Sequence, residues 1–305
     1  MMKKFLVIIL AALVILILVK NNKQIEVGKD AEVIPEQQED IMQKVQTFSI
    51  SGFSENGKNK WQVEGESADI LSATVNMRAI KARSYGKKTN VTLTADEGTF
   101  FKNSKDIELR KNVIANTDEG TTLKTDKLKW LSEAEKIITD NYVHIQREDI
   151  DVSGKGAEAA PNMKKVQLNR DIKMTIYRAC VEKDNFDNAS KFWTKHETTI
   201  TCDGPLEVDY QNHFSIFNKN VIIEDKEGKI FADKVIAYID PEQKKLYKAV
   251  AKGNVKIMRQ QNTTFSDEAI YLAKEGRVIL VGSPKVVIYS VNRLPEDPNE
   301  INESL

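Results

Sequence analysis

Strict alternation of apolar and polar residues, punctuated by turn residues, governs this chain from Phe48 onward. A two-residue period is the pattern of strands that bury one face. Clear examples are IEL (107–109), VHI (143–145) and VKI (255–257), and glycines separate many of these segments. The chain has no sustained 3.6-residue period and no alternation of strands with helices. The body is therefore predicted to be all-β.

An internal repeat indicates how these strands are organised. The segment LRKNVIANTDEGTTLKTDKLKW (109–130) aligns with FNKNVIIEDKEGKIFADKVIAY (217–238), and GNVKIMRQQNTTFSDEAIY (253–271) is a third copy. A unit of about three short strands cannot bury its own apolar face, so it must stack on its neighbours. The repeat therefore predicts an elongated body of stacked strands.

A small residue followed by aspartate recurs along the chain, often about 30 residues apart. A short Asp beside a turn can accept a backbone N–H and fix the bend. We expect this structural role for the recurring aspartates, since their spacing spreads the carboxylates along the body. They are Asp69, Asp96, Asp126, Asp140, Asp233 and Asp267.

The only long uncharged apolar run is FLVIILAALVILILV at residues 5–19, with lysines on both sides. It is slightly short for a spanning helix, but flanking lysines can extend it by snorkelling. A cleaved signal peptide is the alternative, although no A-x-A-like site follows the run. We expect an uncleaved single-pass anchor with its N-terminus inside and the body outside. No Cys directly follows the run, which excludes a lipoprotein anchor.

Composition narrows the partners and the compartment. Hydrophobic residues make up 41% and charged residues 30% of the chain, and 45 basic residues balance 45 acidic ones. A net charge of zero argues against nucleic acid, which requires a basic surface. Cys180 and Cys202 are the only cysteines. They flank a charged segment between two candidate strands, so in an exported chain we expect them to form a disulfide.

The composition shifts divide the chain into six segments. A polar stretch follows the apolar run, a charged segment interrupts the repeat, and a proline-containing acidic stretch ends the chain. The predicted segments are an anchor (1–22), a linker (23–45), a first β-jellyroll (46–179), an inserted loop (180–196), a second β-jellyroll repeat (197–291) and a disordered tail (292–305).

Motifs for catalysis and cofactor binding are absent from the sequence. There is no phosphate-binding G-x-x-x-x-G-K-[ST] loop, no G-x-S-x-G and no H-E-x-x-H. His144, His196 and His213 are far apart in sequence. We therefore predict no catalytic residues, no metal site and no cofactor, and a protein that is not an enzyme.

A known family has a similar arrangement of short motifs behind an N-terminal anchor. The motifs are FSISGFSENGKNKW (48–61), LTADEG (93–98), NV (112–113) with GTTLKTDKLKW (120–130), ITDNYVHI (138–145) and IDVSGKGA (150–157). Over residues 1–175 the chain resembles LptC, the periplasmic subunit of lipopolysaccharide export. Residues 200–290 resemble the related LptA/OstA-type repeat, so the chain departs from the compact LptC pattern by a C-terminal extension and an insertion.

The resemblance implies an elongated, open, twisted β-jellyroll of two facing antiparallel sheets behind one transmembrane helix. It implies an inner-membrane subunit whose periplasmic body receives lipopolysaccharide from the ABC exporter and passes it along an apolar groove towards the outer membrane. The implied partners are lipopolysaccharide, the LptF/LptG permease subunits with the LptB ATPase, and an LptA-like bridge protein joined by edge-strand addition. The sequence leaves open two alternatives, a structural or adhesion-type β-repeat protein with a filled core and a surface-polysaccharide enzyme on a β-solenoid.

The apolar members of the alternating segments are the candidates for the groove lining, because one parity of each strand in a two-sheet body faces inward. For any single position, packing in a closed core is an equally good interpretation. The candidates are Ile107, Leu109, Val113, Leu123, Leu128, Trp130, Val143, Ile145, Val166, Leu168, Ile172, Met174, Leu206, Val208, Val221, Ile223, Ile230, Val255, Ile257, Val286 and Ile288.

Overall fold

The computed structural model describes residues 41–53, 59–85, 90–160, 165–181, 193–242 and 245–288. Within these ranges the chain forms seventeen strands and no helix, so the all-β expectation is confirmed for them. The predicted anchor, most of the linker and the predicted tail lie outside the described residues. The strands are β1 (Gln43–Phe53), β2 (Asn59–Ile70), β3 (Thr74–Ser84), β4 (Val91–Phe101), β5 (Ile107–Thr117), β6 (Thr122–Leu131), β7 (Lys136–Arg147), β8 (Ile150–Ala159), β9 (Lys165–Val181), β10 (Trp193–Cys202), β11 (Leu206–Asp209), β12 (Phe214–Asp225), β13 (Gly228–Ile239), β14 (Leu246–Arg259), β15 (Asn262–Leu272), β16 (Arg277–Val281) and β17 (Lys285–Val287).

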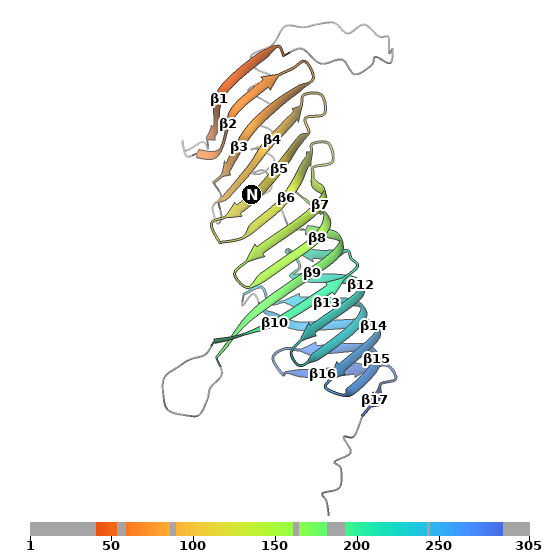
Figure 1. Ribbon diagram of the computed structural model, residues 1–305. Coiled ribbons are helices and arrows are strands. Elements are labelled where there is room, and N and C mark those ends of the chain that lie inside the picture. The colour runs from red at the N-terminus through yellow and green to blue at the C-terminus, as the bar shows by residue number, and fades with distance from the viewer. Residues whose placement is uncertain are drawn as a thin grey trace, which may run out of the picture.

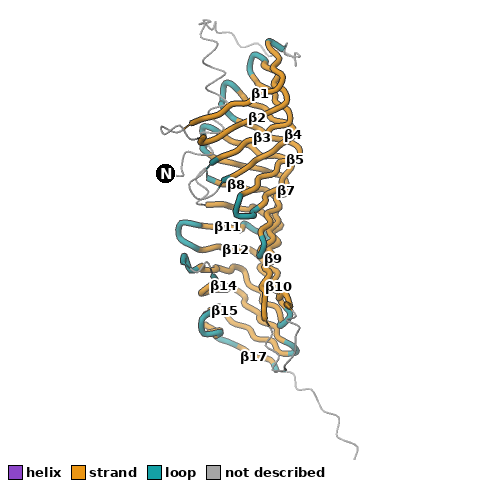
Figure 2. Tube along the Cα trace, turned by 90° about the vertical axis from the view of Figure 1, so that its left-hand side faces the viewer, coloured by secondary structure: helices purple, strands orange, loops and turns teal. Residues whose placement is uncertain are grey.

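Nearly every strand pairs antiparallel with the strand that follows it, and the strands stack along an elongated body (Figure 1). The long strand β9 pairs with both β10 and β11, and β12 pairs with β10, β11 and β13. The hydrogen-bonded ladder is therefore continuous from β1 to the β16 and β17 end. A side view shows the strands following one another along its whole length (Figure 2).

A bend inside most long strands divides this ladder into two antiparallel sheets. The pairing register shifts in mid-strand, for example between Arg110 and Val113 where β5 meets β6, and between Lys252 and Val255 where β14 meets β15. Such bulges bend a strand and increase its twist. Sheet I denotes the strand portions that contain Leu123 and Ile257, and sheet II the portions that contain Leu109 and Phe217.

The repeated Asn-Val of the sequence forms these bends. Asn112, Asn220 and Asn254 have positive φ angles of 49°, 51° and 47°. Asparagine adopts this left-handed conformation more readily than most residues. The valine that follows each asparagine then points into the body and is buried. The internal repeat is therefore a repeat of strand bends.

The recurring aspartates support the bends, in a way the sequence did not predict. The amide of Asn112 donates to Asp96 over 2.7 Å, and the amide of Asn254 donates to Asp233 over 2.8 Å. Both aspartates lie within strands β4 and β13, next to the bend of the following strand. At these two positions Asp accepts a side-chain hydrogen bond across the ladder instead of fixing a turn between strands.

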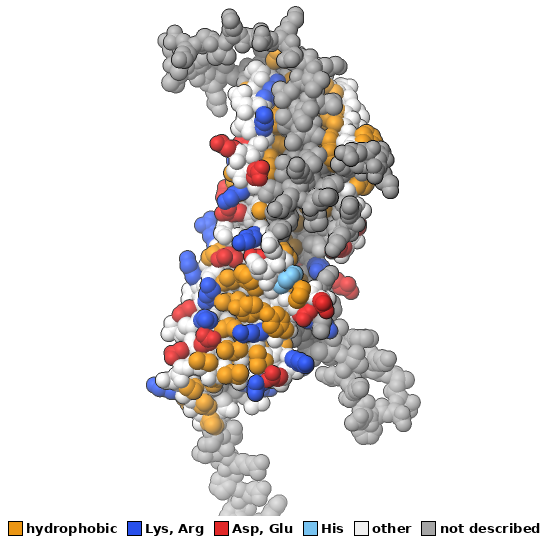
Figure 3. Space-filling model, turned by 180° about the vertical axis from the view of Figure 1, so that it is seen from behind, with side chains coloured by type: hydrophobic (Ala, Val, Ile, Leu, Met, Phe, Trp, Pro, Cys, Tyr) orange, Lys and Arg blue, Asp and Glu red, His pale blue; other side chains and the backbone are white. Residues whose placement is uncertain are grey.

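The two sheets pack on each other through two hydrophobic clusters. The first extends from Trp61 to Ile137 and joins β2 to β7, and the second extends from Val152 to Ala269 and joins β8 to β15. Each cluster contains residues of both sheets, so the bent ladder encloses an apolar interior. Viewed from behind, the C-terminal half also carries a dense group of hydrophobic side chains bordered by charged ones (Figure 3).

The predicted disulfide between Cys180 and Cys202 is wrong. Strands β9 and β10 do form a hairpin, but Cys202 pairs with Ile172 and Cys180 pairs with Thr194. Eight positions along β9 separate the two cysteines, about 26 Å at 3.3 Å per residue, whereas bridged Cα atoms lie within about 7 Å. Cys202 is a buried free thiol, and burial raises its pKa.

Strands extend further into the predicted inserted loop than the sequence suggested. The loop was predicted at 180–196, but β9 continues to Val181 and β10 begins at Trp193. These two residues are paired, so the hairpin arms reach into the segment from both sides. Its charged composition concealed this pairing, because cross-strand hydrogen bonds form between backbones whatever the side chains are.

Candidate functional site: an open apolar trough

One row of side chains on the inner face of sheet I crosses the entire body. Each member is the cross-strand partner of the next, from β1 to β17, and Thr264 is its only polar residue. In order, the row is Ile50, Val63, Ala82, Leu93, Ala115, Leu123, Ile145, Val152, Met174, Ile200, Ile223, Ile230, Ile257, Thr264 and Val286.

Sheet II presents a second apolar wall to the same interior. Its inner side chains belong to the two hydrophobic clusters and are mostly buried. They are aliphatic or aromatic in the first part of the body as well as in the second. Representative members are Met77, Leu109, Leu128, Leu168, Leu206, Phe217, Val235 and Ala251.

Burial decreases from the bend of the strands towards the open side. The bend residues Val113, Val221 and Val255 have only 0%, 1% and 1% of their surface exposed. Most of the inner row of sheet I, including Leu123 and Ile257, is only half-buried. The bottom is thus filled by side chains, while the wall above it remains partly uncovered. This is the geometry of an open apolar trough.

The structure brings most of the predicted lining residues into this trough. Val113, Val143, Ile172, Val221 and Val255 lie at the bend. The inner row of sheet I contains Leu123, Ile145, Met174, Ile223, Ile230, Ile257 and Val286, and the inner side of sheet II contains Ile107, Leu109, Leu128, Trp130, Val166, Leu168, Leu206 and Val208.

Two of the predicted lining residues are largely exposed, and several members of the inner row were not predicted. Ile288 follows β17 and is 73% exposed, and Val286 at the last strand is 57% exposed, so neither is covered by the body. The prediction omitted the first part of the inner row, from Ile50 to Ala115, as well as Val152, Ile200 and Thr264. Their alternating pattern was visible in the sequence, but shorter apolar segments made it weaker.

Comparison with models of protein families finds a match for each of two stretches of the chain. A model described as "Lipopolysaccharide-assembly, LptC-related" matches residues 6–178, more than half of the chain. The chain belongs to the LptC family. A second model, described as "LptA/(LptD N-terminal domain) LPS transport protein", matches residues 199–301. No curated protein matches the chain.

The trough runs through both matched parts without interruption. The LptC match ends within β9 and the LptA match begins within β10, and these strands pair with each other. Members of the LptC and LptA families are carrier and bridge proteins of lipopolysaccharide transport, and the LptC family is membrane-anchored and periplasmic. Within the described ranges, no helix is both long and apolar enough to span a bilayer.

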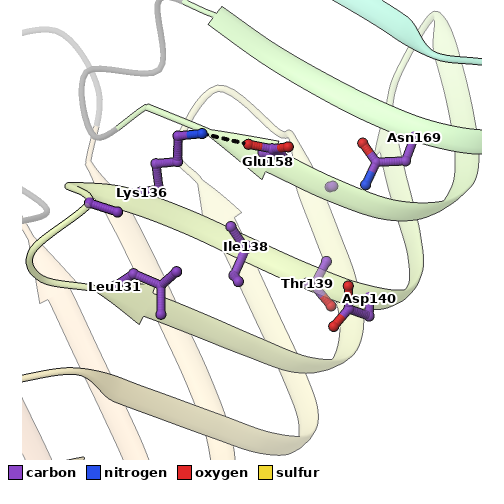
Figure 4. A pocket seen from close by; sticks show the side chains of 9 residues that line it. Leu131, Lys136, Ile138, Thr139, Asp140, Glu158 and Asn169 are labelled. Atoms are coloured by element: carbon purple, nitrogen blue, oxygen red, sulfur yellow. Dashed lines mark hydrogen bonds and ion pairs between the residues drawn. The ribbon is translucent and has the colours of Figure 1, made fainter.

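A cavity of about 340 Å³ lies in the LptC-matched part, near the transition between the two hydrophobic clusters (Figure 4). The ladder between β6 and β7 is interrupted here, with no pairing between Thr125 and Lys129. Lys136 and Glu158 form an ion pair of 2.9 Å at its side, and Asp140 and Asn169 add polar groups. Its mixed lining does not continue the apolar trough.

The outer face of the LptC-matched part is charged and internally paired. The carboxylate of Glu108 accepts from Arg110 at 2.9 Å and lies 3.0 Å from Lys127 and 3.2 Å from Lys129. Its side chain is only 11% exposed. Burial raises the pKa of Glu108, but the hydrogen bonds from the three cations outweigh it and lower the pKa from 4.5 to about 2.

This shift predicts an acid-sensitive contribution to stability. Because the folded-state pKa lies below the unfolded one, the contribution is complete above pH 4.5 and is lost as the pH falls towards 2. We expect Glu108→Gln to lower the free energy of unfolding at pH 7 by about 1–2 kcal/mol, after allowance for solvent screening of the exposed cations. The difference from wild type should vanish near pH 2, as measured by urea unfolding. A constant difference across this range would contradict the assignment.

Proposed function

We propose that this protein is the inner-membrane-anchored periplasmic subunit that receives lipopolysaccharide from the ABC exporter and conducts it towards the outer membrane. The observation that carries the proposal is the inner row of sheet I, which is apolar from Ile50 to Val286 except at Thr264 and is only half-buried over much of its length. A structural β-repeat protein has no need for a continuous uncovered apolar wall.

The physical problem of transport suits this geometry. Each acyl CH₂ exposed to water costs about 0.8 kcal/mol, so lipid chains need continuous shielding in an aqueous compartment. An apolar trough supplies that shielding without directional contacts, and chains can slide along it. Because the trough is open on one side, the sugar part of the lipid can remain in water.

The ends of the ladder suggest how the subunit joins its neighbours. Strand β1 pairs only with β2, and β16 and β17 pair only with β15, among the residues that the structure describes. Such edges are sites for strand addition. In the proposal, the β1 edge faces the LptF/LptG permease with its LptB ATPase, and the β16–β17 edge continues into an LptA-like bridge protein. Residues 5–19 form the anchor, with the N-terminus in the cytoplasm.

Photocrosslinking in living cells tests the conduit. A photoreactive amino acid is placed at Leu123 and Ile230 in the inner row and, as matched controls, at their outward neighbours Lys124 and Lys229. We expect lipopolysaccharide adducts at the two inner positions, which lie in different family-matched parts, and at least about tenfold less at the controls. Equal adducts on both faces, or none at folded inner variants, would favour a structural β-repeat protein instead.

A further inference from the structure

One row of cross-strand partners on the outer face of sheet II changes its character along the body. From β2 to β11 the row is polar or charged except for Ile138, whereas from β12 to β16 every member is aliphatic. The first part is Asp69, Asn76, Thr99, Glu108, Lys129, Ile138, Glu158, Gln167 and Glu207, and the second is Ile216, Ile236, Val250, Ile270 and Ile279.

The aliphatic part of this row faces away from the trough. Its members alternate with Phe217, Val235, Ala251 and Ala269, which belong to the second hydrophobic cluster, whereas the row itself does not. The lining of the trough does not explain these outward aliphatic residues.

Two flanking rows complete a surface that we call the outer apolar face. On one side, Lys248 lies over the ring of Tyr238 at 5.5 Å, and on the other Lys252 forms a 3.3 Å ion pair with Glu268. The first flank is Phe214, Tyr238, Lys248, Leu272 and Arg277, and the second is Asn218, Lys234, Lys252, Glu268 and Val281.

About one particular axis, the aliphatic row and two outer pairs of the outer apolar face are complementary to those of a second copy. A two-fold axis parallel to the strands and passing by β14 places each strand opposite its counterpart on the other side of β14. Lys234 then lies opposite Glu268 of the second copy, and Phe214 lies opposite Arg277, a favourable cation–π pair. The aliphatic row meets itself, with Val250 facing Val250. Contacts away from the axis occur twice, as in any isologous interface. On the axis itself, Lys248 and Lys252 of β14 each lie opposite the same lysine of the second copy.

The alternative two-fold axis, which is perpendicular to the strands, pairs no opposite charges. An axis perpendicular to the strands would set Lys248 against Lys252 and leave Glu268 opposite Leu272. The central row is mostly covered, since Val250 is 4% exposed and Ile279 is its only member with as much as 37% of its surface exposed. Such a β-branched surface suits packing against another sheet, as in β-sandwiches, better than insertion into a membrane.

We propose that two copies of this chain pair back to back through the outer apolar face, with each trough facing away from the interface. Five strands about 4.8 Å apart and three side-chain rows give roughly 500 Å² per copy. The total of about 1,000 Å² lies at the small end of specific interfaces and fits a weak, reversible dimer. The proposal does not depend on what the trough carries.

Photocrosslinking of the full chain in its own membrane tests the dimer. A photoreactive residue replaces Ile279, which the two-fold axis places opposite Ile216, and the control replaces Lys129 in the polar part of the same row. We expect an adduct of twice the chain mass at position 279, mapped by mass spectrometry to the region of Ile216, and none at position 129. Adducts to lipid or to a different protein, or no adduct at 279, would overturn the proposal.

A charge swap distinguishes a specific two-fold interface from non-specific hydrophobic association. Lys234→Glu and Glu268→Lys alone each place like charges opposite each other, so each should reduce the adduct by at least about tenfold. Co-expression of the two single variants, or the double variant, restores opposite charges and should restore the adduct. Glu268→Lys also removes the ion pair between Glu268 and Lys252. If this destabilises the fold, Lys234→Gln serves as the milder variant, because it removes the attraction across the interface without adding repulsion. Failure of the mixed pair to recover above either single variant would refute the axis.

Discussion

Replacing Ile257 by Asp is expected to leave a folded protein that no longer carries lipopolysaccharide. Ile257 belongs to the half-buried inner row, between Ile230 and Thr264 on the neighbouring strands. In the empty trough the new carboxylate reaches water, so the free energy of unfolding should fall by no more than about 1–2 kcal/mol. Against an acyl chain the same charge loses its hydration, which costs several kcal/mol. Each 1.4 kcal/mol is a factor of ten, so lipopolysaccharide crosslinking should fall at least about tenfold.

The neighbouring residue provides the matched control. Met258 lies on the same strand with its side chain on the opposite face, so Met258→Asp adds the same charge outside the trough. We expect Met258→Asp to retain wild-type crosslinking and a similar melting temperature. Unchanged crosslinking in a stably folded Ile257→Asp variant would remove this position from the conduit.

Replacing Val143 by Asp is expected to unfold the LptC-matched part. Val143 is only 2% exposed and lies at the bend, opposite Thr125 and Gly154. A carboxylate at this position is buried without a cationic partner, which we expect to cost roughly 3–5 kcal/mol. A thermal melt followed by circular dichroism should show a large drop in melting temperature or no cooperative transition.

Tyr142 is the control for Val143, because it precedes it on β7 and is 63% exposed. Tyr142→Asp should change the free energy of unfolding by about 1 kcal/mol or less. A Val143→Asp protein as stable as Tyr142→Asp would mean that water reaches the bend, and that the trough is deeper than its side chains indicate. The two aspartate substitutions thus separate the filled bottom from the open wall.

Much of the fold followed from local patterns. The two-residue period from Phe48 predicted strands, and the repeated segments at 109–130 and 217–238 predicted stacking. Both depend on which residues are apolar and on their spacing, and a strand fixes the side of each residue by parity alone. For this reason the sequence indicated which side chains of most strands face the interior, while their contact with a lipid stays a prediction.

The bends were present in the sequence but could not be interpreted there. The Asn-Val pairs at 112–113 and 220–221 were seen as part of a repeat, yet nothing local indicates that Asn takes a positive φ in mid-strand. That conformation depends on an aspartate of the neighbouring strand, such as Asp96, which accepts the Asn amide. Whether a position lies in the filled bottom or on the open wall of the trough also depends on contacts between strands.

The cysteine prediction failed because register is a property of pairs of strands. Hairpin neighbours were inferred correctly for β9 and β10, but the position of the turn sets which residues face each other. An eight-position offset separated Cys180 from Cys202 without any change in the pattern of either strand.

The sequence by itself determined that this chain is a stack of β-strands with one apolar parity, because alternation and turn residues act within a few neighbouring positions. Only the tertiary structure decided that the inner row is continuous from Ile50 to Val286, and that the outward residues from Ile216 to Ile279 lie in one line. Both rows join residues from many strands. Their alignment depends on the summed registers and bulges of all the pairs between them, a quantity that no single segment encodes.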